Sequence, residues 1–166
     1  PEHWRKIAFK QIIKTRKGVA FSTSDFCDSG IRVVKASDIK QLSLNQSDVF
    51  LPKDFITKYP KAYLAQGNII LSTVGSTPDV RNSAVGQIAM VPQKLDKTLL
   101  NQNTVVFDPI GNAINRNYLF FVLQTRAYRD HLDLHAHGTA NQASLNVADM
   151  LDFKCFIPSI DEQHQI

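Results

Sequence analysis

One periodic segment among many short, strand-like runs most constrains the fold of this chain. Between residues 115 and 135, large side chains recur every three or four positions and would cover one face of a helix. They are Tyr118, Phe121, Val122, Thr125, Tyr128 and Leu132. The other apolar runs are short, rich in β-branched residues and ended by Gly or Pro, as strands are. Because strands and helices do not alternate strictly, the sequence predicts an α+β domain with a mixed or antiparallel, strongly curved β-sheet.

The individual elements follow from the same patterns. Strands are expected at residues 4–9, 31–36, 68–74, 85–91, 100–108 and 153–157. Short helical segments are expected at residues 10–15, 52–60 and 147–151, beside one long helix at about 115–135. A chain of 166 residues, 43% of them hydrophobic, is long enough for one buried core, so a single domain is predicted.

Nothing in the sequence indicates a membrane segment or an export signal. No apolar run reaches the roughly 18 residues that a membrane-spanning helix needs. The opening "PEHWRKIAFKQ" has neither the apolar stretch nor the cleavage site of a signal peptide. Cys27 and Cys155 lie far apart and have no metal-binding spacing, which favours two free thiols. We therefore expect a cytoplasmic protein.

The net charge is +4, and basic side chains gather near the N-terminus. They are Arg5, Lys6, Lys10, Lys14, Arg16 and Lys17, with Glu2 as the only acid in that stretch. Such a segment is either a solvated surface or a set of contacts to phosphates, and charge alone fits both.

Four potential metal ligands raise the alternative of a metal-dependent enzyme. His131, Asp133, His135 and His137 alternate with apolar residues, and on a strand they would share one face and could hold zinc or iron. The segment continues the predicted helix, however, and Leu132 stands where a zinc protease carries its glutamate. Histidines at the negative end of a helix dipole are therefore the favoured interpretation.

Other catalytic motifs are weak or missing from the sequence. Pro78-Asp79 resembles the start of a nuclease motif, but the strand expected next supplies no second acid or lysine, which favours a turn. There is no phosphate-binding glycine loop and no nucleophile elbow. Several polar loops instead carry the Arg, Asn, Gln and Thr side chains that read base edges, although each also suits an ordinary turn. They include residues 81–82, 101–103 and 139–142.

The last residues, "FIPSIDEQHQI", are typical of a helix start. Ser159 and Glu162 form the S-x-x-E pattern of a capping box, and Asp161 adds negative charge near the positive end of the helix dipole. Only about two helical turns can follow, too few to be stable alone in water.

In order along the chain, these segments resemble a known family, the target recognition domain of type I restriction-modification specificity subunits. "WRKIAFKQII" with "KTRKG" resembles the family's opening Trp, strand and glycine, and "GIRVVKASDIKQ" resembles its next strand. "LAQGNIILSTVGS" resembles "L-…-G-D-I-L-I-S-…-G-S", with Asn68 at the usual aspartate. The most specific match is the ending, where "FIPSIDEQHQI" resembles "I-P-L-P-P-L-…-E-Q-…-I" with Ser159 at the second proline.

The resemblance implies a non-catalytic chain that reads one half of a split double-stranded DNA target. A second recognition domain would read the other half, and spacer helices would separate the two. Methyltransferase (modification) subunits would supply S-adenosylmethionine chemistry, and a restriction/translocase subunit would supply ATP- and Mg-dependent cleavage. Residues 1–158 would then be the recognition domain and residues 159–166 the truncated start of a spacer helix. A recognition domain of a fused restriction-methylation enzyme, or a protein-interaction scaffold, remains an alternative.

Within this framework, loops on one face should read bases, and basic residues should hold phosphates. The base-reading residues are predicted to be Ser76, Thr77, Arg81, Asn82, Asn141 and Gln142. The phosphate contacts are predicted to be Arg16, Lys17 and Lys35. No cofactor or metal ligand is expected in this chain.

Overall fold

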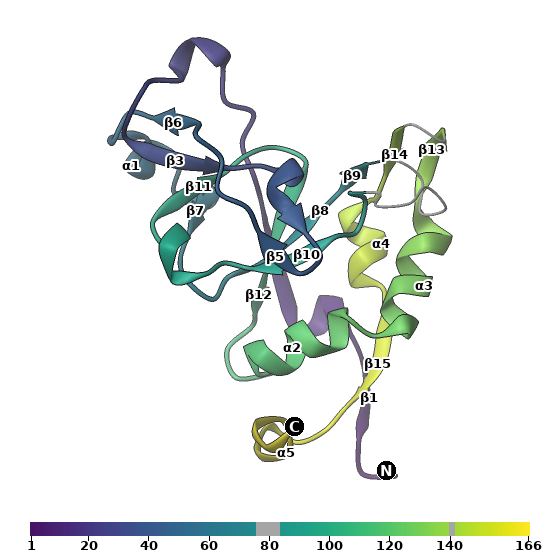
Figure 1. Cartoon of the computed structure of the whole chain (residues 1–166). Coiled ribbons are helices and arrows are strands. Elements are labelled where there is room, and N and C mark those ends of the chain that lie inside the picture. The colour runs from purple at the N-terminus through teal and green to yellow at the C-terminus, as the bar shows by residue number, and fades with distance from the viewer. Residues whose placement is uncertain (76–83, 140–141) are drawn as a thin grey trace.

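The computed structural model describes residues 1–75, 84–139 and 142–166. The chain is an elongated α+β domain in which both ends lie at one extremity and β13 and β14 lie toward the other (Figure 1). The predicted class is confirmed, but within the described residues the strands divide among several small sheets instead of one. The reason is strand length, since most strands have only two to four residues before the chain turns.

The central sheet is antiparallel, in the order β10-β8-β12-β2. Its strands are β10 (Ile88–Met90), β8 (Ile69–Ser72), β12 (Thr104–Pro109) and β2 (Ile13–Lys17). Every residue of β8 is buried, which explains its continuous apolar run. A second sheet has the order β6-β3-β11-β7 and is mixed, because β11 pairs parallel with β3. Its strands are β6 (Phe50–Leu51), β3 (Ile31–Val34), β11 (Thr98–Leu100) and β7 (Tyr63–Leu64).

Three smaller pairings complete the framework. β1 (Arg5–Ala8) pairs antiparallel with β15 (Lys154–Ile157), which brings the first and last strands together. β4 (Ile39–Lys40) and β5 (Ser43–Leu44) form a tight hairpin. The third is a three-stranded sheet of β13 (His137–Thr139), β14 (Gln142–Ser144) and β9 (Val74–Gly75).

The predicted long helix is two helices, α2 (Arg116–Leu123) and α3 (Arg126–His135). Thr125 interrupts it, because its hydroxyl donates to the Val122 carbonyl at 2.7 Å and caps the next helix by accepting from the Tyr128 N–H. The predicted start at Asn115 is confirmed by its side chain, which accepts from the backbone of the first turn. The shorter helices are α1 (Phe55–Lys58), α4 (Val147–Leu151) and α5 (Ile160–Gln165).

Two local predictions are wrong. The helical turn expected at residues 10–15 is only a 3-10 turn at Phe9–Gln11, and residues 13–15 belong to β2, where β-branched Ile13 is buried. The single strand expected at residues 100–108 is two strands, β11 and β12. Asn103 adopts a left-handed conformation with φ of 66°, which asparagine tolerates, and this lets the chain turn between them.

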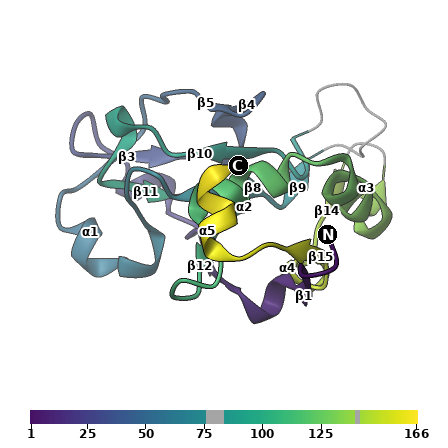
Figure 2. The same cartoon turned by 90° about the horizontal axis from the view of Figure 1, so that it is seen from below.

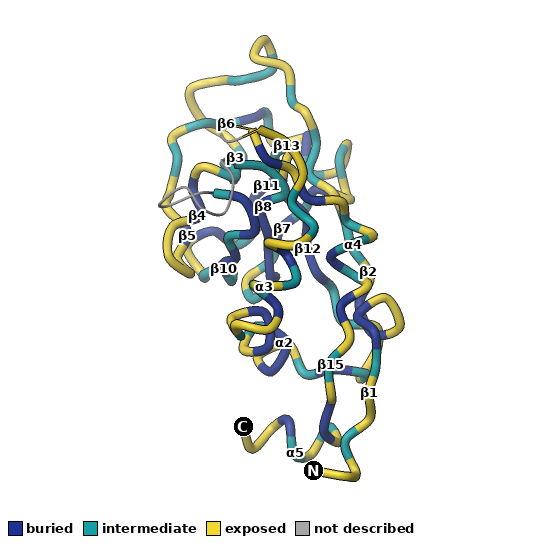
Figure 3. The backbone as a smooth tube through the Cα atoms, turned by 90° about the vertical axis from the view of Figure 1, so that its right-hand side faces the viewer, coloured by how far each residue is buried: buried dark blue, intermediate teal, exposed yellow. Residues whose placement is uncertain are grey.

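The main core lies where α2 and α3 cover the central sheet. Phe9, Tyr128 and Phe153 pack ring against ring, with centroids 5.0 to 5.3 Å apart. Burial raises the pKa of Tyr128 far above its usual range, so its hydroxyl stays neutral. Figure 3 shows the buried residues of this region and the exposed residues near β13 and at the chain ends. Within the described residues, no helix is long and apolar enough to cross a membrane.

Candidate nucleic-acid interface

The sheet β13-β14-β9 brings the chain on either side of residues 140–141 next to the chain that leads into residues 76–83. Thr139 pairs with Gln142 in the β13–β14 ladder, and Ala143 of β14 pairs with Gly75 of β9. Ala143 is buried and anchors this small sheet to the core. Of the predicted base-reading residues, Gln142 lies on β14 and is exposed. The other five lie outside the described residues: Ser76, Thr77, Arg81, Asn82 and Asn141.

Two glycines allow close backbone contacts in this sheet. A side chain at Gly138 would lie 2.0 Å from the carbonyl oxygen of Gln142, and its φ of +132° disfavours other residues. At Gly75, a Cβ atom would lie 2.3 Å from the backbone nitrogen of Val85. Glycine at position 138 therefore lets β13 approach β14, and glycine at position 75 lets β9 approach the backbone of Ala84 and Val85.

A polar groove of about 490 Å³ lies beside this sheet. Side chains that can contact DNA line it, namely Lys17, Thr73, Gln102, Asn103 and Asn146. The Thr73 N–H donates to the Asn103 carbonyl at 2.9 Å, and the Leu145 N–H donates to the Thr73 carbonyl at 2.8 Å. These bonds hold the β11–β12 turn, the end of β8 and the start of α4 together. The groove thus joins residues that are distant in sequence.

Asn146 shows how local capping positions one wall of the groove. Its side chain accepts from the Ala148 N–H at 2.9 Å and begins α4, as the sequence predicts. Gln102 and Asn103 are exposed at the turn opposite. Their amide-rich composition was visible in the sequence, but the folding of Asn146 against them was not, because it depends on long-range pairing.

The three predicted phosphate residues have different surroundings. Lys17 is exposed and lines the groove. Lys35 is half-buried and follows Val34, whose carbonyl accepts from the Asn101 N–H at 2.8 Å. The backbone of Lys35 therefore lies beside the turn that forms one wall of the groove.

Arg16 makes contacts within the chain, and its phosphate role stays a prediction. Its Nε donates to the Asp108 carboxylate at 2.6 Å, and its Nη1 donates to the carbonyls of Lys61 and Tyr63 at 2.9 and 2.8 Å. Protein acceptors therefore hold two of the three guanidinium nitrogens, and these bonds tie β12 and the start of β7 to β2.

Two of the basic N-terminal residues contact other parts of the chain. Lys10 pairs with Asp152 at 2.8 Å, and Lys6 lies 5.8 Å from the ring centre of Phe156. Both contacts belong to the β1–β15 region at the chain ends. Lys6 and Lys10 therefore make their contacts away from the polar groove.

The predicted metal ligands are divided between two elements. His131 and His135 lie on α3, where their rings contact each other and bond to backbone carbonyls, while His137 lies on β13. Asp133 pairs with Arg129 at 2.9 Å. Across residues 1–75, 84–139 and 142–166, no three His, Cys, Asp or Glu side chains come together as a metal site would require. Cys27 and Cys155 are free thiols.

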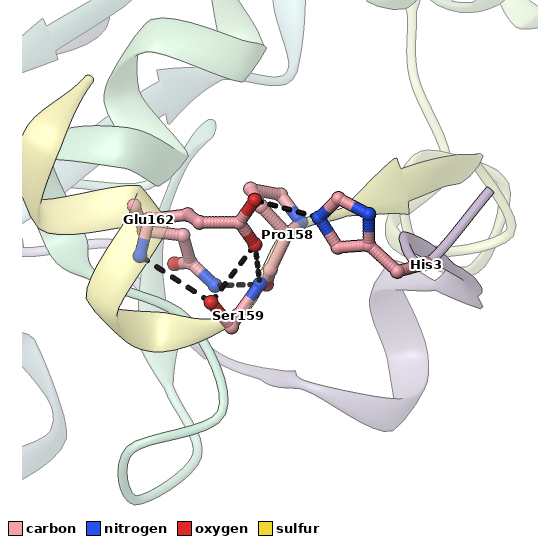
Figure 4. A network of polar contacts seen from close by, with 5 residues as sticks. His3, Pro158, Ser159 and Glu162 are labelled. Carbon is pink, nitrogen blue, oxygen red and sulfur yellow. Dashed lines mark hydrogen bonds and ion pairs between the residues drawn. The ribbon is translucent and has the colours of Figure 1, made fainter. Parts of the chain in front are cut away.

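The predicted capping box at the C-terminus is confirmed (Figure 4). The Ser159 N–H donates to the Glu162 carboxylate at 2.9 Å, and the Glu162 N–H donates to the Ser159 hydroxyl. His3 adds a contact that sequence reasoning missed, 2.7 Å from the same carboxylate. The hydrogen bond from His3, followed by those from Ser159, lowers the pKa of Glu162 to about 2. This network joins the N-terminus to α5.

A family model, the type I restriction modification DNA specificity domain, matches residues 1–166 of this chain. The chain belongs to this family. Among curated proteins, it is 25% identical over 98% of its length to the type I restriction enzyme MjaVIII specificity subunit of Methanocaldococcus jannaschii. It is 22% identical to the putative MjaX specificity subunit of the same organism. It spans 37% and 38% of these relatives, little more than a third of their length.

Solved structures share the fold. The chain matches a type I restriction-modification S subunit from M. genitalium with a TM-score of 0.65 and 12% identity, covering 98% of this chain and 37% of that one. The HsdS subunit of Thermoanaerobacter tengcongensis matches with a TM-score of 0.64 and 13% identity, covering 99% and 36%. The family and fold expected from the sequence motifs are confirmed.

Proposed function

We propose that this domain reads one half of a bipartite double-stranded DNA target and directs partner subunits to it. Membership of the DNA specificity family supports DNA recognition as its task. The observation that carries the proposal is the β13-β14-β9 sheet, in which Gly75, just before residues 76–83, pairs with the β14 strand that follows residues 140–141, beside the polar groove.

In this proposal, the two segments contact base edges and the groove holds the DNA backbone. Arg81 and Asn82 suit guanine and adenine, and Gln142 offers a second amide for adenine. Ser76, Thr77 and Asn141 complete the readout. Lys17 contacts a phosphate from the groove, and Lys35 contacts one beside the neighbouring turn. Phosphate contacts set the position of the duplex, and base contacts set the sequence that is preferred.

The domain contributes no chemistry of its own in this account. Methyltransferase subunits bring S-adenosylmethionine, a restriction/translocase subunit uses ATP and Mg, and a second recognition domain reads the other half-site. α5 begins a helix that spaces the two domains, at the end of the molecule away from β13 and β14 (Figure 1). All of these interactions take place in the cytoplasm.

Reconstitution with the modification subunits tests the proposal. Genomic DNA from cells with and without this protein is mapped for methylation, and the complex is titrated with labelled duplex at several salt concentrations. We expect a split methylated sequence only when the protein is present, together with binding that weakens as salt rises. An unchanged methylation map, with no salt-dependent binding to any duplex, would contradict the proposal.

A further inference from the structure

The β4–β5 hairpin has a turn whose conformation its sequence does not favour. Ile39 pairs with Leu44 and Lys40 pairs with Ser43, so Gln41 and Leu42 form a two-residue turn. Both have positive φ, 46° and 68°, which is the signature of a type I′ turn. Asn-Gly adopts this turn most readily, whereas a left-handed leucine is strained by its Cβ atom.

Packing within the chain explains the base of this hairpin but not its tip. Ile39 and Leu44 are buried in a core cluster, and Leu42 forms an isolated backbone bridge with Ala89 of β10. The side chains of Lys40, Gln41 and Leu42 are exposed, and Leu42 retains 46% of its accessible surface. A backbone bridge does not need a leucine side chain. Core packing therefore explains where the hairpin lies, but it does not explain why its turn has the sequence Gln-Leu.

The hairpin adjoins the chain that leads into β10. A hollow of about 240 Å³ separates the two, lined by Ile39, Lys40 and Gln41 on the hairpin side and by Ala84 and Gln87 on the other. Ala84 and its neighbour Val85 also pack closely against Gly75 of β9. Ala84 therefore lies next to both the hairpin and β9, and Figure 2 shows β4 and β5 beside β10.

We propose that the tip of the β4–β5 hairpin is a further DNA-contacting element, one that helps to set specificity. This inference rests on the function proposed above. Lys40 holds a phosphate, the Gln41 amide meets a base edge, and Leu42 makes apolar contact with a thymine methyl or a sugar. Strain that persists in an exposed turn is typical of a functional element, because the surrounding structure holds it in place. Base contacts would explain both the strain and the exposed leucine.

The test uses a double variant that improves the turn while removing its side chains. Gln41→Asn with Leu42→Gly supplies the favoured Asn-Gly turn, so the protein should unfold at the same or a higher temperature. In the complex with modification subunits, the variant should bind its methylated target about tenfold more weakly, the effect of losing one good base contact. The probe is a labelled duplex carrying the sequence found by methylation mapping, competed with a scrambled duplex.

Lys97→Gly is the matched control. Lys97 is exposed and, like Gln41 and Leu42, left-handed, with φ of 59°. The side chain of its neighbour Asp96 accepts from the Gln66 N–H. Gly67, the next residue, faces Arg116 at the start of α2, so this turn lies on the side of the molecule toward the chain ends. The control should relieve the same kind of strain without changing DNA affinity.

The outcomes separate the two proposals. If the parent complex binds and the hairpin variant binds equally well, the hairpin inference is overturned and the proposed function stands. If the variant binds weakly but also unfolds earlier, the turn is structural and the inference fails. If the parent complex neither binds nor methylates DNA, both proposals fail together.

Discussion

The central strand β8 and the outlying strand β13 differ in almost every physical property. All four residues of β8 are buried, and Ile69, Ile70 and Leu71 have no accessible surface. All three residues of β13 are exposed, and the strand depends on a glycine for its pairing with β14. One strand belongs to a scaffold whose sequence is constrained by packing, and the other to a surface that can change without unfolding the domain.

Core substitution should produce the largest difference between the two regions. Leu71→Ala removes a fully buried side chain from β8 and should lower the free energy of unfolding by about 2–5 kcal/mol. Gln142→Ala on exposed β14 should change it by less than about 0.5 kcal/mol. Denaturant unfolding measures both. Equal losses would show that the two regions are not distinct in stability.

Gly138→Ala should affect recognition more than stability. The added methyl group meets the Gln142 carbonyl and separates β13 from β14, so DNA affinity in the complex should fall by about tenfold. Gly111→Ala is the control, since Gly111 also has positive φ but no neighbour within 4 Å of the added carbon. Binding titrations compare the two variants, and equal affinities would argue against a role for this sheet.

Ser159→Ala tests the opposite end of the molecule. Loss of the cap should destabilise α5 by about 1 kcal/mol and speed hydrogen exchange at the Gln163 amide, which donates to the Ser159 carbonyl. DNA affinity should not change. Weakened binding would mean that α5 and the recognition surface are coupled.

Lys17→Ala should have a smaller and sequence-independent effect. Loss of one phosphate contact weakens binding to all duplexes alike and reduces the slope of log affinity against log salt by about 1. Lys94→Ala, an exposed lysine on the 3-10 turn at Gln93–Leu95, should leave the slope unchanged. If Lys17→Ala changed the DNA sequence that is preferred, Lys17 would contact a base and not only a phosphate.

The smallest expected effect is a local pH response of α5. The pKa of Glu162 is lowered from 4.5 to about 2, so its contacts stabilise the fold above pH 4.5 and are lost as pH falls toward 2. Hydrogen-exchange protection factors at the first turn of α5, corrected for the pH dependence of intrinsic exchange, should fall over this range before those of the core. Replacing His3 with Ala should move the transition to higher pH.

The sequence predicted features that depend on neighbours along the chain and missed those that depend on distant contacts. The capping box at Ser159 follows from local chemistry and is confirmed, and the helices expected to begin near residues 115 and 147 are present. The helix break also has a local signal, the capping residue Thr125. The apolar periodicity continues across this residue, however, and predicts one uninterrupted helix. No local pattern revealed that acceptors on β12 and β7 occupy Arg16, or that His3 meets Glu162.

The polar groove shows the same division within the candidate interface. The sequence identified Lys17 and the amides at residues 101–103 as side chains that can contact DNA. It could not show that they lie beside Thr73 and Asn146, because this depends on backbone hydrogen bonds between segments that are distant in sequence. The positions of Ser76, Thr77, Arg81, Asn82 and Asn141 stay predictions.

Methylation mapping of an Arg81→Ala variant tests the central claim most directly. The reconstituted complex should methylate a relaxed sequence in which one position of one half-site is no longer selected, a loss of about 1–3 kcal/mol of discrimination. His164→Ala, at an exposed site on α5, should give the parent sequence. An Arg81→Ala map identical to the parent map, at unchanged DNA affinity, would contradict the claim that this end of the domain reads the DNA sequence.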